Sequence, residues 1–558
     1  MRTSGVCNVL LVYPRFDNPS FWQLTAVCEV TGRRSISPPL GLMTVAALLP
    51  SEWQVRLVDR NAEELTDDDL DWADLVMTGG MIPQQPDTLR VIALCNARGK
   101  TVAVGGPDVT SSPQVYRDAD ILVSGEAEGV MDEFVRSWNA GNRSGVFEAE
   151  KFKTDLTTSP VPRFDLVKLN DYVDINVQFS RGCPFNCEFC DIIELYGRVP
   201  RTKTTEQMLA ELDALYELGY RGRVEFIDDN LIGNKKAVKK FLPHLCEWQK
   251  RHGYPFLLGT QATVNLADDD ALLALMRDAN FWSVFIGIET PDPDVLVITQ
   301  KKQNTRRNLT ACIHKIYSYG IVVTAGFIIG FDGEKDGIAE EMIACIEATN
   351  IPLCMVGLLT ALPNTQLVRR LEREGRLDAA PDVGLFFEAT ADHGDQCTGG
   401  LNFKTTRPRR DILADYRLVL QRVYEPSAYF GRVRKLGGLL KPPKPKGMLQ
   451  AKVIADDVRT LGRLAWRLVT RHRELVPLFC ANLFDCAIHN PAALKSVVSQ
   501  MIVYLHAGPF ARYVVGYLDR QIATIDAEGD NCLVAAVPVA GTPPGLREDA
   551  GKAVARLH

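Results

Sequence analysis

The sequence predicts an α/β protein with a doubly wound, Rossmann-like N-terminal domain, a partial (β/α)6 barrel of the TIM type and a C-terminal helical region. Short apolar, β-branched segments alternate with helical patterns over residues 6–135 and again over 174–376, and long helical patterns follow. A chain of 558 residues has room for about three or four domains. We expect the following divisions: a first domain at 1–150, a linker at 151–174, the barrel at 175–376 and the helical region at 377–558.

Composition and charge exclude several classes of protein. Hydrophobic residues make up 46% and charged residues 24% of the chain, which argues against a disordered, collagen-like or coiled-coil protein. The net charge of -6 gives no general attraction to polyanions, so we expect no nucleic-acid partner. The apolar run from Ile321 is too short to span a membrane, and the first residues lack the apolar core of a secretory signal. We therefore expect a cytoplasmic protein, with contact to the inner membrane surface left open.

The first unit has continuous apolar strands, typical of a parallel sheet that is buried on both faces. A ligand of such a sheet lies beyond the carboxyl ends of its strands. Glycine is frequent at those ends, where it permits close approach of a ligand, although any α/β turn also favours it. No GxGxxG is present, so a dinucleotide is poorly supported. The expected strands are 6–13, 54–59, 73–80, 101–106 and 119–126, with helices at 40–49 and 87–99, and the strand-end residues are Gly79, Gly80, Gly105, Gly106, Gly125 and Glu126.

The second unit repeats the strand–helix alternation and predicts a partial parallel barrel. The chemistry of such a barrel belongs on the loops that follow its strands. Its six expected strands begin at Ile175, Arg223, Phe256, Trp282, Ile321 and Pro352.

Three cysteines stand in the loop after the first barrel strand, in the run SRGCPFNCEFCD. Cys183, Cys187 and Cys190 have C-x3-C-x2-C spacing, and thiolates this close converge on one metal centre. Structural zinc usually has a fourth protein ligand, and no second CxxC or His pair follows nearby. A 4Fe-4S cluster with one iron free of protein ligands fits better, and a zinc site or a bare thiol loop is the alternative.

This motif, at the end of a first barrel strand, resembles that of the radical S-adenosylmethionine (SAM) superfamily. The resemblance implies that the open iron binds SAM, and that cleavage of the sulfonium gives a 5'-deoxyadenosyl radical that abstracts hydrogen from unactivated carbon. It also implies that the backbone of Phe189 approaches the adenine, that Asp228 and Glu289 contact the ribose or the methionyl ammonium, and that Gly326 and Gly330 admit the adenosyl group. The alternative for each acid, and for Asp229, is helix N-capping at a βα turn.

An α/β domain that precedes such a barrel resembles the cobalamin-binding domain of the B12-dependent branch. Gly79, Gly80, Gly105, Gly106, Gly125 and Glu126 would then contact the corrin or its nucleotide tail. The first histidine of the chain is His244, and Asp59, Arg60 and Asn61 follow the second strand. Cobalamin would therefore bind without a protein histidine ligand, or would not bind at all.

Several runs, among them SPPLGLMTVAALLP and ALPNTQL, resemble the subgroup that contains the hopanoid C-2 methylases, over about residues 6–435. That resemblance implies methylation of an unactivated sp3 carbon, C-2 of a hopanoid lipid, with two SAM molecules consumed per product. It implies a lipophilic substrate and an electron donor such as flavodoxin or ferredoxin. Alternatives are the same chemistry on another lipid or natural product, a radical cyclisation, or a non-catalytic cobalamin or cluster sensor.

The C-terminal region carries long helical patterns. We expect helices near 408–437, 447–475, 490–506 and 508–525. The segment 384–403 is a candidate lid over the site, and an ordinary surface loop is the alternative. The stretch 432–473 is rich in Lys and Arg, which is typical of a solvated helix face or of an amphipathic surface for anionic lipid headgroups.

Overall fold

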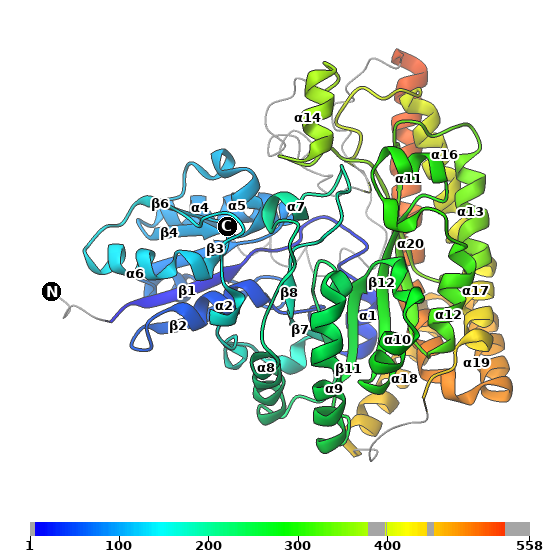
Figure 1. Ribbon diagram of the computed structural model, residues 1–558, viewed down its shortest axis with the longest axis horizontal. Helices are drawn as coiled ribbons and strands as arrows, with labels where there is room; N and C mark the ends of the chain where they lie inside the picture. Colours follow the sequence, from blue (N-terminus) through cyan, green and yellow to red (C-terminus); the bar gives the residue numbers. More distant parts are fainter. Residues whose placement is uncertain (1–5, 378–396, 398, 444–450, 530–558) are drawn as a thin grey trace.

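The protein consists of two parallel six-stranded sheets side by side and a helical layer against the second sheet (Figure 1). The structure, a computed structural model, describes residues 6–377, 397, 399–443 and 451–529. The predicted doubly wound domain, partial barrel and helical region are all confirmed. The boundaries drawn between them stay predictions, and the predicted lid lies largely outside the described residues.

The first sheet has the strand order β2-β1-β3-β4-β5-β6, all parallel. The five expected strands are present, and a sixth, β6, adds an edge that the sequence analysis missed. Only Phe147 of its four residues is buried, so β6 lacks the apolar run typical of an inner strand. The elements are β1 (Asn8–Tyr13), β2 (Gln54–Asp59), β3 (Leu75–Gly79), β4 (Thr101–Gly105), β5 (Ile121–Ser124) and β6 (Gly145–Glu148), with α2 (Leu40–Leu48), α3 (Asp67–Trp72), α4 (Gln85–Ala97), α5 (Pro107–Ser111) and α6 (Met131–Asn139).

The second sheet is the open barrel, and all six of its expected strands are confirmed. Its order, β14-β13-β12-β11-β10-β7, follows the chain, so each strand pairs with the next one in sequence. The elements are β7 (Asp174–Val177), β10 (Arg223–Phe226), β11 (Leu257–Ala262), β12 (Phe281–Glu289), β13 (Val322–Ile329) and β14 (Cys354–Leu358), with α8 (Thr205–Glu217), α9 (Lys235–Arg251), α10 (Asp270–Asp278), α11 (Pro293–Ile298), α12 (Leu309–Ser318) and α13 (Ile338–Thr349).

The helical region differs from the prediction in three places. The helix expected at 408–437 breaks at Glu425, because this residue caps a new helix that has Pro426 at its first position. The two helices expected at 490–506 and 508–525 are one, which continues through Pro509 because buried residues flank the proline on both sides. The helix at 476–489 was missed. The elements are α14 (Gln366–Arg373), α16 (Arg409–Val423), α17 (Pro426–Leu439), α18 (Ala451–Arg471), α19 (Val476–His489) and α20 (Leu494–Glu528). No described helix has both the length and the apolar character needed to cross a membrane.

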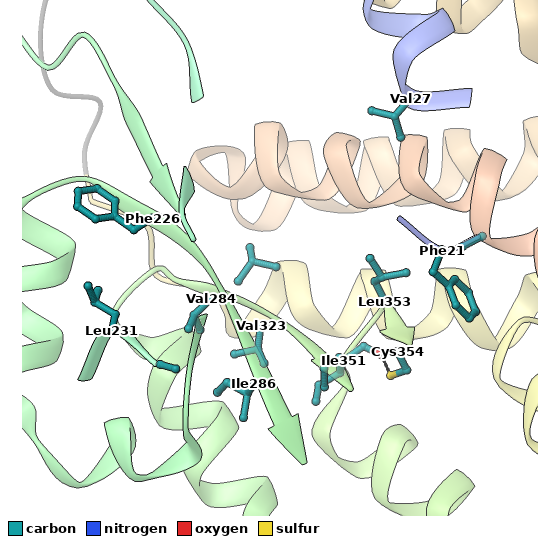
Figure 2. Close-up of a cluster of buried hydrophobic side chains, with 14 of the residues drawn as sticks. Phe21, Val27, Phe226, Leu231, Val284, Ile286, Val323, Ile351, Leu353 and Cys354 are labelled. Carbon is teal, nitrogen blue, oxygen red and sulfur yellow. Dashed lines mark hydrogen bonds between the residues drawn. The ribbon is translucent and has the colours of Figure 1, made fainter. Parts of the chain in front are cut away.

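A segment of the first unit crosses to the helical layer and joins the three parts. Helix α1 (Thr25–Thr31) contacts α18 and α20. The Phe21 ring meets that of Phe510 edge-to-face, with centroids 4.6 Å apart. Figure 2 shows Phe21 and Val27 in the same apolar cluster as the barrel residue Leu353. The crossing segment therefore closes the space between the two sheets on one side.

The barrel and the helical layer are joined by Arg432, whose side chain is fully buried. Its Nε donates to the carbonyl oxygen of Ile351 at 3.0 Å and its Nη2 to that of Val423 at 2.6 Å, and the guanidinium pairs with Glu347. A planar group with several donors suits this position, because it satisfies carbonyl groups at the end of α16 and before β14 at once.

We expect Arg432→Ala to destabilise the protein by about 3 kcal/mol, because buried carbonyl groups and Glu347 lose their partner. Urea unfolding followed by circular dichroism measures the effect as a lower midpoint. The control is Arg434→Ala, which removes a largely exposed ion pair with Asp485 and should change the midpoint little. Equal midpoints for the two variants would contradict this role of Arg432.

Candidate functional site

A cavity of about 1970 Å³ lies between the first sheet and the barrel. Ordinary ligand pockets measure roughly 300–1,000 Å³, so this one has room for more than one drug-sized ligand. The six residues predicted at the strand ends of the first sheet all line it: Gly79, Gly80, Gly105, Gly106, Gly125 and Glu126. Their contact with a corrin stays a prediction.

The glycines at this edge are required by the packing of the strand ends. A Cβ on Gly79 would overlap the carbonyl oxygen of Gly105, and one on Gly80 would lie 2.6 Å from Oε1 of Gln84. Gly106 has φ +99°, which an L side chain rarely adopts. The result is a cavity wall formed largely by backbone, suited to a broad, flat ligand.

The loop after β2 is held by its own polar contacts. Oδ1 of Asp59 accepts hydrogen bonds from the backbone and side chain of Asn61, and Arg60 pairs with the buried Asp87 at 2.7 Å. Arg60 and Asn61 line the cavity, and no histidine is among the described residues that line it.

Two acids that follow β10 hold the start of the cysteine loop. Asp228 is fully buried and accepts hydrogen bonds from the backbone amides of Phe179 at 3.1 Å and Ser180 at 2.5 Å. Asp229 accepts from the amide of Gly182 at 2.8 Å. The alternative of helix capping is wrong for both, since Asn234 caps α9. Burial raises the pKa of Asp228 to about 6 and that of Asp229 to about 7.

Both carboxyl oxygens of Asp228 already accept hydrogen bonds from the loop, and this residue does not line the cavity. Its contact with a cofactor therefore stays a prediction. Asp229 does line the cavity, so of the two neighbouring acids it is the one that faces the open space. The sequence pattern does not distinguish them, because both follow the same strand end.

Side-chain amides point at two of the three predicted cluster ligands. Nδ2 of Asn230 lies 4.0 Å from Sγ of Cys183, and Nε2 of Gln303 lies 3.6 Å from Sγ of Cys187. Hydrogen bonds to sulfur are one means by which proteins tune iron–sulfur clusters. Burial, the charge of Asp191 and the neighbouring thiols raise the pKa of the Cys190 thiol, so this cysteine needs a metal centre to become a thiolate at neutral pH.

The donor set fits an iron–sulfur cluster better than zinc. A structural zinc site usually has four protein ligands, and the cysteine loop supplies three. A cubane cluster binds each thiolate through a different iron, and Cys183, Cys187 and Cys190 supply three such ligands from one loop.

Glu289 forms a buried ion pair with Lys301, with Oε1 and Nζ 2.6 Å apart. Its backbone is left-handed, with φ +69°, at a shift in the pairing of β12 with β13. Such a conformation costs about 1–3 kcal/mol in a non-glycine residue and is found mainly at functional sites. Burial alone would lower the pKa of Lys301, but the charge of Glu289 raises it above its ordinary value, so the ammonium stays charged.

Lys301 is a residue that the sequence analysis missed, and it brings predicted residues together. Its Nζ lies 5.9 Å from the ring centroid of Phe189, and Cys187 and Cys190 are close enough to contribute to the raised pKa of this ammonium group. No motif in the sequence marks it, since it stands outside every strand end and cysteine loop. Phe189, Glu289 and the cysteine loop therefore meet around one buried ammonium group.

The local packing explains why glycine stands at positions 326 and 330, at the fifth barrel strand. A Cβ on Gly326 would lie 3.0 Å from Cζ of Phe285. Gly330 has φ +106°, a Cβ there would lie 2.6 Å from Leu401, and its amide donates to Glu334 at 3.0 Å. Neither glycine lines the cavity, so their approach to an adenosyl group stays a prediction.

Buried charges join the first sheet to the cysteine loop. Arg181, two residues before Cys183, donates to Glu126 at 3.0 Å and to Glu128 at 2.8 Å. Arg201 donates to the other oxygen of Glu126 at 2.6 Å. Burial alone would raise the pKa of Glu128, but the charge and hydrogen bonds of Arg181 lower it to about 2. The sequence analysis identified only Glu126 of this network.

The comparisons with known proteins agree with this arrangement. A family model described as the radical SAM superfamily matches residues 177–346, and one for a domain of unknown function (DUF4070) matches residues 365–519. The uncharacterized methyltransferase sll1242 of Synechocystis is 43% identical, over 88% of this chain and 89% of its own. The hopanoid C-2 methylase of Rhodopseudomonas palustris is 38% identical, over 76% of this chain and 78% of its own.

Two solved structures share the fold. The cobalamin-dependent S-adenosylmethionine radical enzyme OxsB has a TM-score of 0.58 and 14% identity, covering 95% of this chain and 82% of that one. The radical S-adenosylmethionine methyltransferase TsrM from Kitasatospora setae has a TM-score of 0.53 and 16% identity, covering 68% of this chain and 80% of that one. The fold class predicted from the sequence is therefore that of known enzymes with this domain combination.

We expect Glu128→Gln to lower the free energy of unfolding by about 3 kcal/mol at neutral pH. The native carboxylate contributes its stability above its ordinary pKa and loses it as the pH falls toward 2, so the difference between variant and native protein should shrink on acidification. Urea unfolding at several pH values between about 6 and 3 measures this. Glu133→Gln, at an exposed position of α6, should not change the pH dependence. A constant difference across this range would contradict the assignment.

Proposed function

Since the chain belongs to the radical SAM methyltransferase family of the hopanoid C-2 methylase, we propose that it is a cobalamin-dependent enzyme that methylates C-2 of a hopanoid lipid. The observation that carries the proposal is the single large cavity, bounded by the glycine edge of the first sheet on one side and by the barrel on the other. A lipophilic polycyclic substrate needs such room beside its cofactors.

Each cofactor has a set of residues suited to hold it. In this proposal Cys183, Cys187 and Cys190 bind a 4Fe-4S cluster, and the strand-end glycines with Glu126 receive cobalamin without a histidine ligand. Phe189 and Glu289 lie against SAM. When bound, these groups supply a carbon-centred radical and a transferable methyl group, chemistry that no side chain provides. The reductant is a small electron-transfer protein such as a flavodoxin or ferredoxin.

The residues of the chain act by positioning and by excluding water. The ion pairs of Arg181 hold the first sheet and the cysteine loop at a set distance from each other. Asp228 and Asp229 hold the loop from the barrel side through its backbone amides. A reactive radical requires such a closed, rigid site, because water and loose side chains offer competing hydrogen atoms.

The proposal is tested with purified holoenzyme under anaerobic, reducing conditions, with a hopanoid and SAM labelled in its methyl group. We expect a product that carries one labelled methyl group at C-2, detected by mass spectrometry. Cys190→Ala should lose both turnover and bound iron. An unmethylated hopanoid together with formation of 5'-deoxyadenosine would contradict this substrate, and absence of 5'-deoxyadenosine would contradict the enzyme class.

We also propose that α18 rests on the surface of an anionic membrane. Ile454, Val458, Leu461 and Val469 are spaced along one side of this helix and are 45–62% exposed. Trp466, 74% exposed, lies between this stripe and the arginines of the same helix. Apolar side chains beside arginines suit the boundary between headgroups and acyl chains. The arginines are Arg459, Arg463, Arg467 and Arg471, each four residues from the next.

We expect Trp466→Gln to reduce cosedimentation with vesicles that contain phosphatidylglycerol several-fold, because an interfacial anchor is lost. Vesicles of phosphatidylcholine alone should bind the native protein weakly. Val146→Gln, at an exposed apolar position of β6, is the matched control and should bind like the native protein. Unchanged binding of the Trp466 variant would contradict contact through α18.

A further inference from the structure

The barrel contributes a polar patch to the cavity, away from the cysteine loop. Asp174 and Arg223 are the first residues of β7 and β10 and pair in register, and Glu225 pairs with Asn176. Asp174, Asn176, Arg223 and Glu225 all line the cavity. The cysteines lie beyond the opposite, carboxyl end of the same sheet, so this patch is at the far end of the barrel from the cluster loop.

The Glu225 carboxyl group faces the cavity without a hydrogen bond or ion pair to any described residue. Within the residues that the structure describes, the same holds for Asp174. The guanidinium of Arg223 is held instead by Oγ of Ser499, 3.0 Å away, and by the ring of Trp282, 4.3 Å away. Burial raises the pKa of Glu225 well above its ordinary value, the charge of Asp174 adds to this, and the charge of Arg223 opposes it. Asp174 and Glu225 are both partly buried and face the cavity, so a ligand that displaces water there gains affinity by pairing with them.

The neighbouring strand leaves space for this carboxyl group. Gly259 of β11 stands opposite Glu225 in the parallel register. A Cβ on Gly259 would overlap Oε2 of Glu225 and would lie 2.9 Å from Oγ of Ser283. The glycine therefore allows the Glu225 side chain to lie across β11 beside Ser283, a second residue that lines the cavity.

The chemistry of the lining changes along the strands. Ile227 lies two residues beyond Glu225, and Phe285 lies two residues beyond Ser283, and both line the cavity. Since alternate residues of a strand face the same side, these apolar side chains continue the same wall toward the cysteine loop. Gln178 and Gln261 line the cavity at the same level, so the wall nearer the cluster loop mixes apolar side chains with amides, whereas the unpartnered carboxyl groups of Asp174 and Glu225 lie at the far end.

We infer that Asp174, Glu225 and Ser283 bind the hydroxylated end of an otherwise apolar substrate, and so orient the opposite end toward the cluster loop. A hydroxyl group both donates and accepts hydrogen bonds, which suits a patch of carboxyl, amide and hydroxyl side chains. A neutral ligand end also avoids the cost of burying a further charge. This inference rests on the proposed function, which supplies the apolar body of the substrate.

The test compares two radiolabelled probes on unreduced holoenzyme, a hopane hydrocarbon and the same skeleton with a hydroxylated side chain. Binding is measured as probe retained on gel filtration, without turnover. We expect the native protein to bind the hydroxylated probe about tenfold more tightly. Glu225→Leu should remove this preference, and Glu225→Gln, which keeps the hydrogen-bonding shape, should retain most of it.

Gly259→Ala is the independent variant, because its methyl group takes the place of the Glu225 carboxyl group and should also remove the preference. Glu217→Leu, at an exposed position at the end of α8, is the matched control. Circular dichroism and bound iron should match the native protein in every variant. A preference that survives in Glu225→Leu and Gly259→Ala, or an equal loss of both probes, would overturn the inference. If the native protein binds neither probe, the proposed function falls with it; equal binding of both overturns the inference alone.

Discussion

Buried ion pairs between Glu126, Glu128, Arg181 and Arg201 hold the cysteine loop against the first sheet. Charges withdrawn from water are stable only when each has partners in good geometry, so this network tolerates few alternative arrangements of the two units. Arg181 stands two residues before Cys183, so its ion pairs with the first unit also fix where the cluster loop begins. The cavity between them depends on this spacing.

Around the cysteine loop, polar side chains of the barrel mainly form hydrogen bonds with backbone amides of the loop. Asp228 and Asp229 bind amides of the loop, and Glu289, whose backbone is left-handed, pairs with Lys301. Strain of this kind persists only where the surrounding contacts outweigh it. The rigid loop and the backbone-walled edge of the first sheet are together suited to cofactors whose own chemistry is demanding.

In the proposed lipid reaction, the polar end of the barrel and contact of α18 with a membrane together give the substrate a direction. A substrate drawn from a membrane is apolar over most of its length, and the wall formed by Ile227 and Phe285 suits that part. The carboxyl groups of Asp174 and Glu225 suit a polar end. In the proposed complex, binding of the polar end sets which end of the substrate faces the cluster loop, so binding energy helps to place the reacting carbon.

Apolar periodicity determined the strands and helices of both sheets, and cysteine spacing determined the candidate cluster ligands, because both patterns are local in the chain. The exposed edge strand β6 and helix α19 carried too weak a pattern to be found. Only the tertiary structure decided which polar residues meet: Arg181 and Glu126 are 55 residues apart, and Ser20 and His506 are 486 apart. Lys301, Glu225 and Gly259 belong to no motif. Their positions follow from strand register and burial, which depend on the whole fold.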